Sequence, residues 1–281
     1  MGAAIRELSS PAEFKQTEAL QRAAWHMDDA DVVPGAAMIA IAHEGGLVAG
    51  AFDGEQMVGF VFGFPTADPR RQHSHMLAVL PAYRRTGLGV RLKLFQRDWC
   101  LARGIEQVVW TYDPLVGLNA SFNVRKLGCV VRTYLPDFYG PLSGVNAGAP
   151  TDRFLAEWDL ASSRVAQHVR RLLDPGGRGA GASAEEAPGV AWANVVDGEK
   201  PAQAVLDLEA PRLGVAIPEH FGHLLRSDPD LALRWRLHAR EVFTHYFARG
   251  YAVTGFVRQA GRNAYILEKA GTTGSPSVRA V

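Results

Sequence analysis

One short basic stretch carries the clearest chemical signal in this 281-residue sequence, Arg84-Arg85-Thr86-Gly87-Leu88-Gly89-Val90. A strand-like run precedes it and a helix-like run follows it. Gly87 and Gly89 remove side chains where a phosphate would approach the backbone, and the start of a helix offers unpaired N–H groups and the positive end of its dipole. The stretch could therefore form a pyrophosphate site, or it could be an ordinary strand-to-helix turn with solvated arginines. It lacks the third glycine of the dinucleotide fingerprint and the Gly-Lys-Ser/Thr of a Walker loop.

Strand-like and helix-like runs alternate around this loop, which indicates an α/β fold. Helical spacing covers 14–25, 34–43, 90–102 and 119–127, and strand-like runs cover 47–52, 57–64, 73–79, 107–112 and 130–135. Asp53-Gly54 between two such runs predicts a β-hairpin. In its second strand Phe60 and Phe62 share one face, whereas Gly59 and Gly63 predict a close approach to the backbone.

The composition changes around residues 174–188 to Pro, Gly, Ala and Ser, which is typical of a linker. Beyond it, 229–249 reads as an amphipathic helix, followed by a hairpin over 251–258 and 263–268. We therefore expect an α/β domain over 1–160, a linker over 161–200, a smaller α+β extension over 201–270 and a disordered tail over 271–281. The extension could complete the sheet, close over a substrate site or form a homodimer contact.

The overall charge excludes several classes of partner. Lys and Arg (30) balance Asp and Glu (29), so the net charge of +1 predicts no attraction to nucleic acid or anionic lipid.

Cys100 and Cys129 lack metal-ligand spacing, and we expect no metal and two inert core thiols. The sequence has no apolar run long enough to span a membrane and none after a basic start. These features predict a cytoplasmic protein.

The motif Arg84-x-x-Gly87-x-Gly89, preceded by Val79, Pro81 and Tyr83, resembles the signature of the GNAT acetyltransferase superfamily. The order of the following elements and Lys126-Leu127-Gly128 are also similar, and the resemblance covers about the first 160 residues. It implies a mixed central sheet flanked by helices and an acyl-CoA co-substrate, acetyl-CoA or succinyl-CoA. The segments 110–115, 118–120, 123–128 and 137–140 resemble a bacterial subfamily with members that N-acylate amino acids.

The resemblance assigns most of the site residues to acyl-CoA. The strand end would pair with the pantetheine arm, the loop would hold the pyrophosphate, and a residue of the next helix would reach the arm. These cofactor residues are Leu77, Val79, Arg84, Arg85, Thr86, Gly87, Leu88, Gly89, Val90 and Asn119. The acceptor would be the amine of a small molecule, which attacks the thioester directly.

Several residues are candidates for the chemistry itself. A protonated amine must lose a proton before it attacks, and His75, His73 or Asp113 could accept it. In the family a tyrosine often protonates the departing thiolate, but Val124 occupies that position here. Tyr139 or Tyr134 could replace it.

Three further residues are candidates for acceptor binding. Trp110 would line the acceptor pocket or fill the core, and Arg125 and Arg132 could bind a carboxylate of the acceptor. The missing tyrosine keeps open a non-catalytic acyl-CoA-binding module. A protein N-acetyltransferase is a further alternative.

Overall fold

The computed structural model describes residues 2–140, 150–174, 189–259 and 262–269. Contacts divide the chain into two compact units. Of the described residues, the first unit holds 2–111 and 156–174, and the second holds 112–140, 150–155 and the residues from 189 onward. Each unit combines sheet strands with flanking helices, and parallel and antiparallel pairs both occur. The predicted α/β class with a mixed sheet is confirmed.

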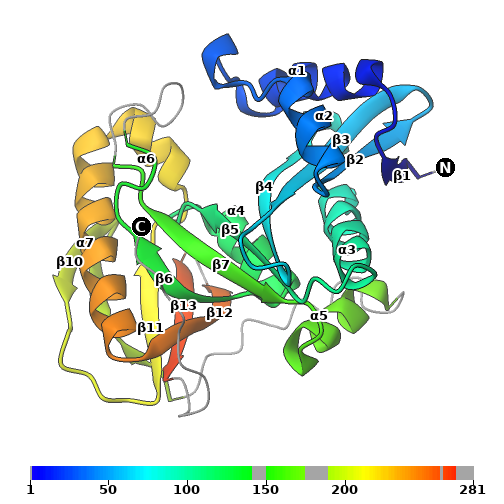
Figure 1. Ribbon diagram of the computed structural model, residues 1–281. Helices are drawn as coiled ribbons and strands as arrows, with labels where there is room; N and C mark the ends of the chain where they lie inside the picture. Colours follow the sequence, from blue (N-terminus) through cyan, green and yellow to red (C-terminus); the bar gives the residue numbers. More distant parts are fainter. Residues whose placement is uncertain (1, 141–149, 175–188, 260–261, 270–281) are drawn as a thin grey trace. The chain divides into compact units, whose positions relative to one another are not determined.

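The first unit contains most of the predicted elements (Figure 1). They are β1 (Ala4–Glu7), α1 (Pro11–Trp25), α2 (Gly35–His43), β2 (Leu47–Asp53), β3 (Gln56–Pro65), β4 (Arg71–Val79), α3 (Leu88–Leu101), β5 (Gln107–Tyr112), the second half of β7 (Arg153–Asp159) and α5 (Ser163–Leu173). Strands β1 to β4 are antiparallel neighbours, and β5 runs parallel to β4. Figure 1 shows α1 and α2 on one side of β2–β4 and α3 on the other.

The two faces of β3 explain this layering. Phe60 and Phe62 are buried in the core that α1 and α2 cover. Gly59 and Gly63 face α3 instead: a Cβ on Gly59 would lie 3.2 Å from Leu92 Cδ1, and a Cβ on Gly63 would lie 3.1 Å from Gln96 Nε2. Because these glycines carry no side chain, α3 packs directly on the strand backbone. The close approach predicted from the sequence is confirmed.

The second unit is built from chain segments that come before and after β7 in the sequence, together with the start of β7. They are α4 (Gly117–Ala120), a π-helix (Ser121–Lys126), β6 (Val130–Leu135), the first half of β7, β8 (Ala191–Trp192), β9 (Asn194–Asp197), β10 (Lys200–Ala204), β11 (Arg212–Ile217), α6 (Phe221–Ser227), α7 (Pro229–Ala248), β12 (Tyr251–Gln259) and β13 (Arg262–Lys269). The strands lie in the order β7-β6-β12-β13-β11-β8, and β9 and β10 form a separate hairpin.

Aromatic side chains fill the interior of the second unit. Phe154 makes edge-to-face contacts with Tyr134, Phe243 and Tyr265, with ring centroids 4.7–5.6 Å apart. The predicted inner stripe of α7, which includes Trp235 and Tyr246, is buried. Edge-to-face pairs add to the stability from buried area alone, so this cluster fixes α7 on the strands.

Three features differ from the sequence prediction. The expected helix over 119–127 is a single α-turn followed by a π-helix. The range 161–200, expected as a linker, contains α5, β8 and β9. Ser162 caps the start of α5, because its hydroxyl accepts a hydrogen bond from the N–H of Val165. Strands β1, β7 and β11 were not predicted, although Phe154, Ala156 and Trp158 alternate as a half-buried strand requires.

Two expectations fall on residues outside the described part of the chain. They are the Pro/Gly/Ala-rich loop over 175–188 and the disordered tail over 271–281. Within the described residues, no helix combines the length and the apolar character that a membrane span requires.

Candidate active site

The loop before α3 presents a run of unused backbone N–H groups. Gly87 adopts a left-handed conformation with φ +86° and forms the N-cap of α3, and Arg85 also has a positive φ of +66°. The first helical hydrogen bond runs from the N–H of Arg91 to the carbonyl of Gly87. Among the described residues, the N–H groups from Arg85 to Val90 have no hydrogen-bond acceptor. The loop and the helix start therefore offer a set of donors for an anion.

The loop is open to ligands. Residues 84–87 are exposed, whereas Leu88 is buried and anchors the helix start. A Cβ on Gly87 would meet no atom within 4 Å, so a ligand has room to approach the backbone. The loop thus combines N–H groups without a partner and an accessible turn, two properties that an anion site uses.

The three arginines near the loop have different roles. The guanidinium of Arg84 donates to the carbonyl oxygen of Ala24 at 2.8 Å and so ties the loop to the end of α1. Arg91 donates to the carbonyl oxygen of Ala3 at 2.7 Å. Arg85 is exposed, and no partner of its guanidinium is found among the described residues. Arg85 is therefore the arginine that can turn to a bound phosphate without breaking a protein contact.

A bulge interrupts β4 where the cofactor arm is expected. Phe62 pairs with Met76 and Gly63 pairs with Ser74, which leaves His75 without a partner on β3. On the other side, the described β4–β5 ladder ends at the pair His73–Val109. Leu77 and Val79 come later on β4. Their backbone edge on the β5 side is therefore outside that ladder. Such an edge can accept an extended ligand as an additional strand.

Two histidines lie at this bulge and differ in their surroundings. The ring of His73 stacks on Phe64 with centroids 4.8 Å apart, and burial lowers its pKa to about 4. His75 is exposed, but one side of its ring lies against Phe62 and Phe64, and burial lowers its pKa as well. Both imidazoles are therefore neutral at pH 7. His75 is the more accessible of the two to a substrate proton.

Trp110 is packed into the interior of the first unit. It is 9% exposed, its ring meets Trp158 edge-to-face, and the ammonium of Lys93 lies 3.7 Å from its centroid. Sequence reasoning left open a pocket wall or a core residue, and the geometry favours the core. Lys93 itself was missed. Its position one helical turn before Gln96 and two turns before Cys100 places it on the buried stripe of α3, which is the signal that could have identified it.

The remaining candidates belong to the second unit. The carboxylate of Asp113 makes two hydrogen bonds to Arg236, of 2.8 and 2.6 Å, and accepts a third from the N–H of Leu115. Asn119 is exposed on the first turn of α4. Arg125 is half-buried and Arg132 is exposed.

The two candidate tyrosine acids are in contrasting environments. Tyr139 is 43% exposed and packs against Phe138. Tyr134 is buried and donates to Asp152 at 2.6 Å, and burial raises its pKa far above the ordinary value. Of the two, only Tyr139 is exposed. The position of Val124, where the family often has tyrosine, is fully buried.

Two further features bear on binding chemistry. Cys100 and Cys129 are buried, as expected, and burial raises the pKa of Cys100 to about 12. Within the described ranges, no three His, Cys, Asp or Glu side chains gather in a metal-binding group.

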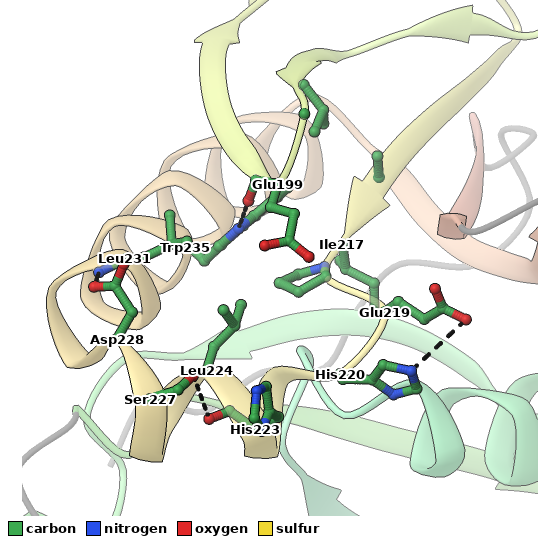
Figure 2. A pocket seen from close by; sticks show the side chains of 14 residues that line it. Glu199, Ile217, Glu219, His220, His223, Leu224, Ser227, Asp228, Leu231 and Trp235 are labelled. Atoms are coloured by element: carbon green, nitrogen blue, oxygen red, sulfur yellow. Dashed lines mark hydrogen bonds and ion pairs between the residues drawn. The ribbon is translucent and has the colours of Figure 1, made fainter.

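A cavity of about 360 Å³ lies in the second unit near α6 and the start of α7 (Figure 2). Figure 2 shows the carboxylate of Glu199 pointing toward Ile217 and Leu224. Asp228, at the rim, caps α7 by accepting from the N–H of Leu231, and Glu219 lies within 4 Å of His220. None of the residues predicted from the sequence to form a site lines this cavity.

Comparison with known proteins finds a family match over the part of the chain that contains the loop. Residues 4–120 match the model of the acetyltransferase (GNAT) family. The matched residues lie in the first unit and the first few residues of the second, so this part of the chain is similar to GNAT acetyltransferases. A search of the curated proteins finds no match.

Solved structures of acetyltransferases are similar over part of the chain. They include the aminoglycoside 6'-N-acetyltransferase from Enterococcus faecium (17% identity, 57% of this chain, 98% of that one, TM-score 0.45). A GNAT-family acetyltransferase from Streptococcus pneumoniae shares 19% identity over 55% of this chain and 96% of its own, with a TM-score of 0.45. An aminoglycoside 6'-N-acetyltransferase complexed with coenzyme A shares 16% identity over 57% and 98%, with a TM-score of 0.45.

The contrast between the loop arginines gives a first prediction. Arg85→Gln should raise the Kd for coenzyme A about tenfold, since one charge-assisted hydrogen bond to phosphate is worth roughly 1.5–3 kcal/mol before screening. The matched variant Arg84→Gln should lower the melting temperature, because it breaks the contact with Ala24. Titration calorimetry at two salt concentrations and a thermal melt measure both effects. An Arg85→Gln protein with unchanged affinity would contradict the assignment.

Proposed function

We propose that this protein transfers an acetyl or larger acyl group from acyl-CoA to the amine of a small molecule, with an amino acid as the favoured acceptor. The unused N–H groups from Arg85 to Val90 support this proposal most directly, because they match the oxygens of a pyrophosphate. Acetyl-CoA and succinyl-CoA are the two donors that we favour.

The proposed reaction is a direct aminolysis of the thioester. The pantetheine arm lies along Leu77 and Val79, and the amine nitrogen attacks the thioester carbon. The resulting oxyanion accepts a hydrogen bond from a backbone N–H such as that of Val79. The C–S bond then breaks, and coenzyme A leaves as a thiol after gaining a proton. Holding both substrates in this geometry supplies much of the rate.

His75 is the proton acceptor that we favour. It is neutral at pH 7, because burial lowers its pKa, and it lies on the strand that would carry the arm. Asp113 is the less favoured base, since Arg236 already occupies its carboxylate. Tyr139 is proposed as the acid for the thiolate, Asn119 as a contact to the arm, and Arg125 and Arg132 as partners of an acceptor carboxylate.

A thiol-release assay with acetyl-CoA, succinyl-CoA and a mixture of amino acids tests the proposal, with product mass shifts identifying the acceptor. His75→Gln should lower kcat by about 100-fold, a typical size for general base catalysis, and leave the Kd for coenzyme A unchanged. The exposed His43 serves as the matched control in His43→Gln. Full activity of His75→Gln would rule out this base.

The pH dependence follows from the lowered pKa of His75. The imidazole accepts a proton only when it is neutral, so kcat/KM should fall as the pH drops through a value below the ordinary 6.5. This acid limb should vanish in His75→Gln. A limb that persists in the variant would assign the titrating group elsewhere.

One observation favours a second candidate function. Val124 is fully buried where the family often has a tyrosine, which is compatible with a domain that binds acyl-CoA without turnover. Tight coenzyme A binding together with no thiol release for any donor or amine would favour this module. Turnover on peptide amines alone would instead indicate a protein N-acetyltransferase.

A further inference from the structure

A lysine side chain is buried inside the first unit, next to the point where the β4–β5 ladder ends. Lys93 on α3 is 2% exposed, and its neighbour on the same stripe, Gln96, is fully buried. The ammonium nitrogen lies 3.1 Å from Ser74 Oγ and 2.8 Å from Gln96 Oε1. It also lies 3.7 Å from the centroid of Trp110 and 5.4 Å from that of Trp158. Burial of an ammonium is costly unless such contacts compensate it.

The two strands meet this ammonium at equivalent positions. The ladder between β4 and β5 ends at the pair His73–Val109. Ser74 and Trp110 are the next residue on each strand, and Lys93 contacts both. A single side chain therefore bridges the two strands at the first position beyond their last backbone pair.

The same helix also carries the proposed pyrophosphate site. Lys93 lies in the second turn of α3, and the unused N–H groups lie at its start. α3 is held to β4 a second time through Gln96, whose amide donates to Gln72 Oε1 at 2.6 Å. We call the region beyond His73 and Val109, where β4 and β5 no longer pair, the fork. The helix thus fixes the distance between the loop that would hold the pyrophosphate and the fork that would hold the pantetheine arm.

We propose that Lys93 is a positioning residue that holds β4 and β5 at the separation the pantetheine arm requires. This inference rests on the proposed function, because it assigns the fork to that arm. Lys93 does not touch the ligand and acts through Ser74 and Trp110. Its loss should therefore weaken binding of a ligand that enters the fork and spare a ligand that occupies only the loop.

Two probes separate these cases on the full chain. Coenzyme A spans the loop and the fork, whereas 3′,5′-ADP carries only the nucleotide end. Lys93→Met keeps the side-chain length and removes the charge. We expect it to raise the Kd for coenzyme A about tenfold or more and to change the Kd for 3′,5′-ADP less than twofold. The exposed Lys15 on α1 provides the matched control in Lys15→Met, which should alter neither value.

Milder variants keep the test decisive if Lys93→Met fails to fold. Ser74→Ala removes one contact of the ammonium and should reduce coenzyme A affinity about threefold relative to 3′,5′-ADP. Trp110→Phe keeps a ring and should do likewise. Equal losses of affinity for both probes would mean that Lys93 has only a structural role. Unchanged affinity for coenzyme A would also overturn the inference. If the wild-type protein fails to bind coenzyme A, the proposed function itself fails, which is a distinct result.

Discussion

Gly87→Val is expected to weaken coenzyme A binding about 100-fold, which corresponds to roughly 2.7 kcal/mol. Gly87 has φ +86°, where a residue with a Cβ is strained by about 1–2 kcal/mol and a β-branched one by more. The loop would relax toward a negative φ and turn the N–H groups away from a shared target. Each lost hydrogen bond to a charged phosphate oxygen costs about 1.5–3 kcal/mol, so the loss of one or two accounts for the effect.

The hairpin turn of β2 and β3 offers a matched control for Gly87→Val. Gly54 has φ +61°, and a Cβ there would also meet no atom within 4 Å. Gly54→Val therefore introduces comparable strain in the same unit, away from the N–H groups of the loop. Calorimetry should show a coenzyme A Kd within twofold of wild type for this variant. Similar losses in both variants would mean that general destabilisation, and not the loop geometry, is responsible.

Asp113→Ala is expected to destabilise the second unit by about 3–5 kcal/mol, the range for an uncompensated buried charge. Arg236 is 2% exposed, and its guanidinium makes both short hydrogen bonds to this carboxylate. Removal of Asp113 leaves the cation on α7 with neither bond. Urea unfolding followed by circular dichroism measures the change.

Two variants complete this experiment. The double variant with Arg236→Met should recover part of the lost stability, because it removes the stranded charge as well. Asp197→Ala, at an exposed acid on β9, should change stability by less than about 0.5 kcal/mol. If Asp113→Ala instead abolished turnover at unchanged stability, Asp113 would be the catalytic base in place of His75.

The elements predicted correctly are those with strong local signals. The hairpin at Asp53-Gly54, the strand and helix around the loop, and the long helix α7 all follow from periodicity and turn residues within a short window. The strands β7 and β11 were missed. β11 runs through Leu213 to Ile217 without alternation, since the strand is buried on both faces, and periodicity alone does not separate such a run from a helix.

The sequence by itself determined the conformation of the loop before α3, because a glycine with a positive φ and the free N–H groups of a helix start are properties of a few adjacent residues. Only the tertiary structure decided the partners of the charged side chains. Lys93 meets Trp110 and Trp158, and Arg236 meets Asp113, across long stretches of chain. Such pairs depend on which elements pack together, and packing depends on the whole fold rather than on any local pattern.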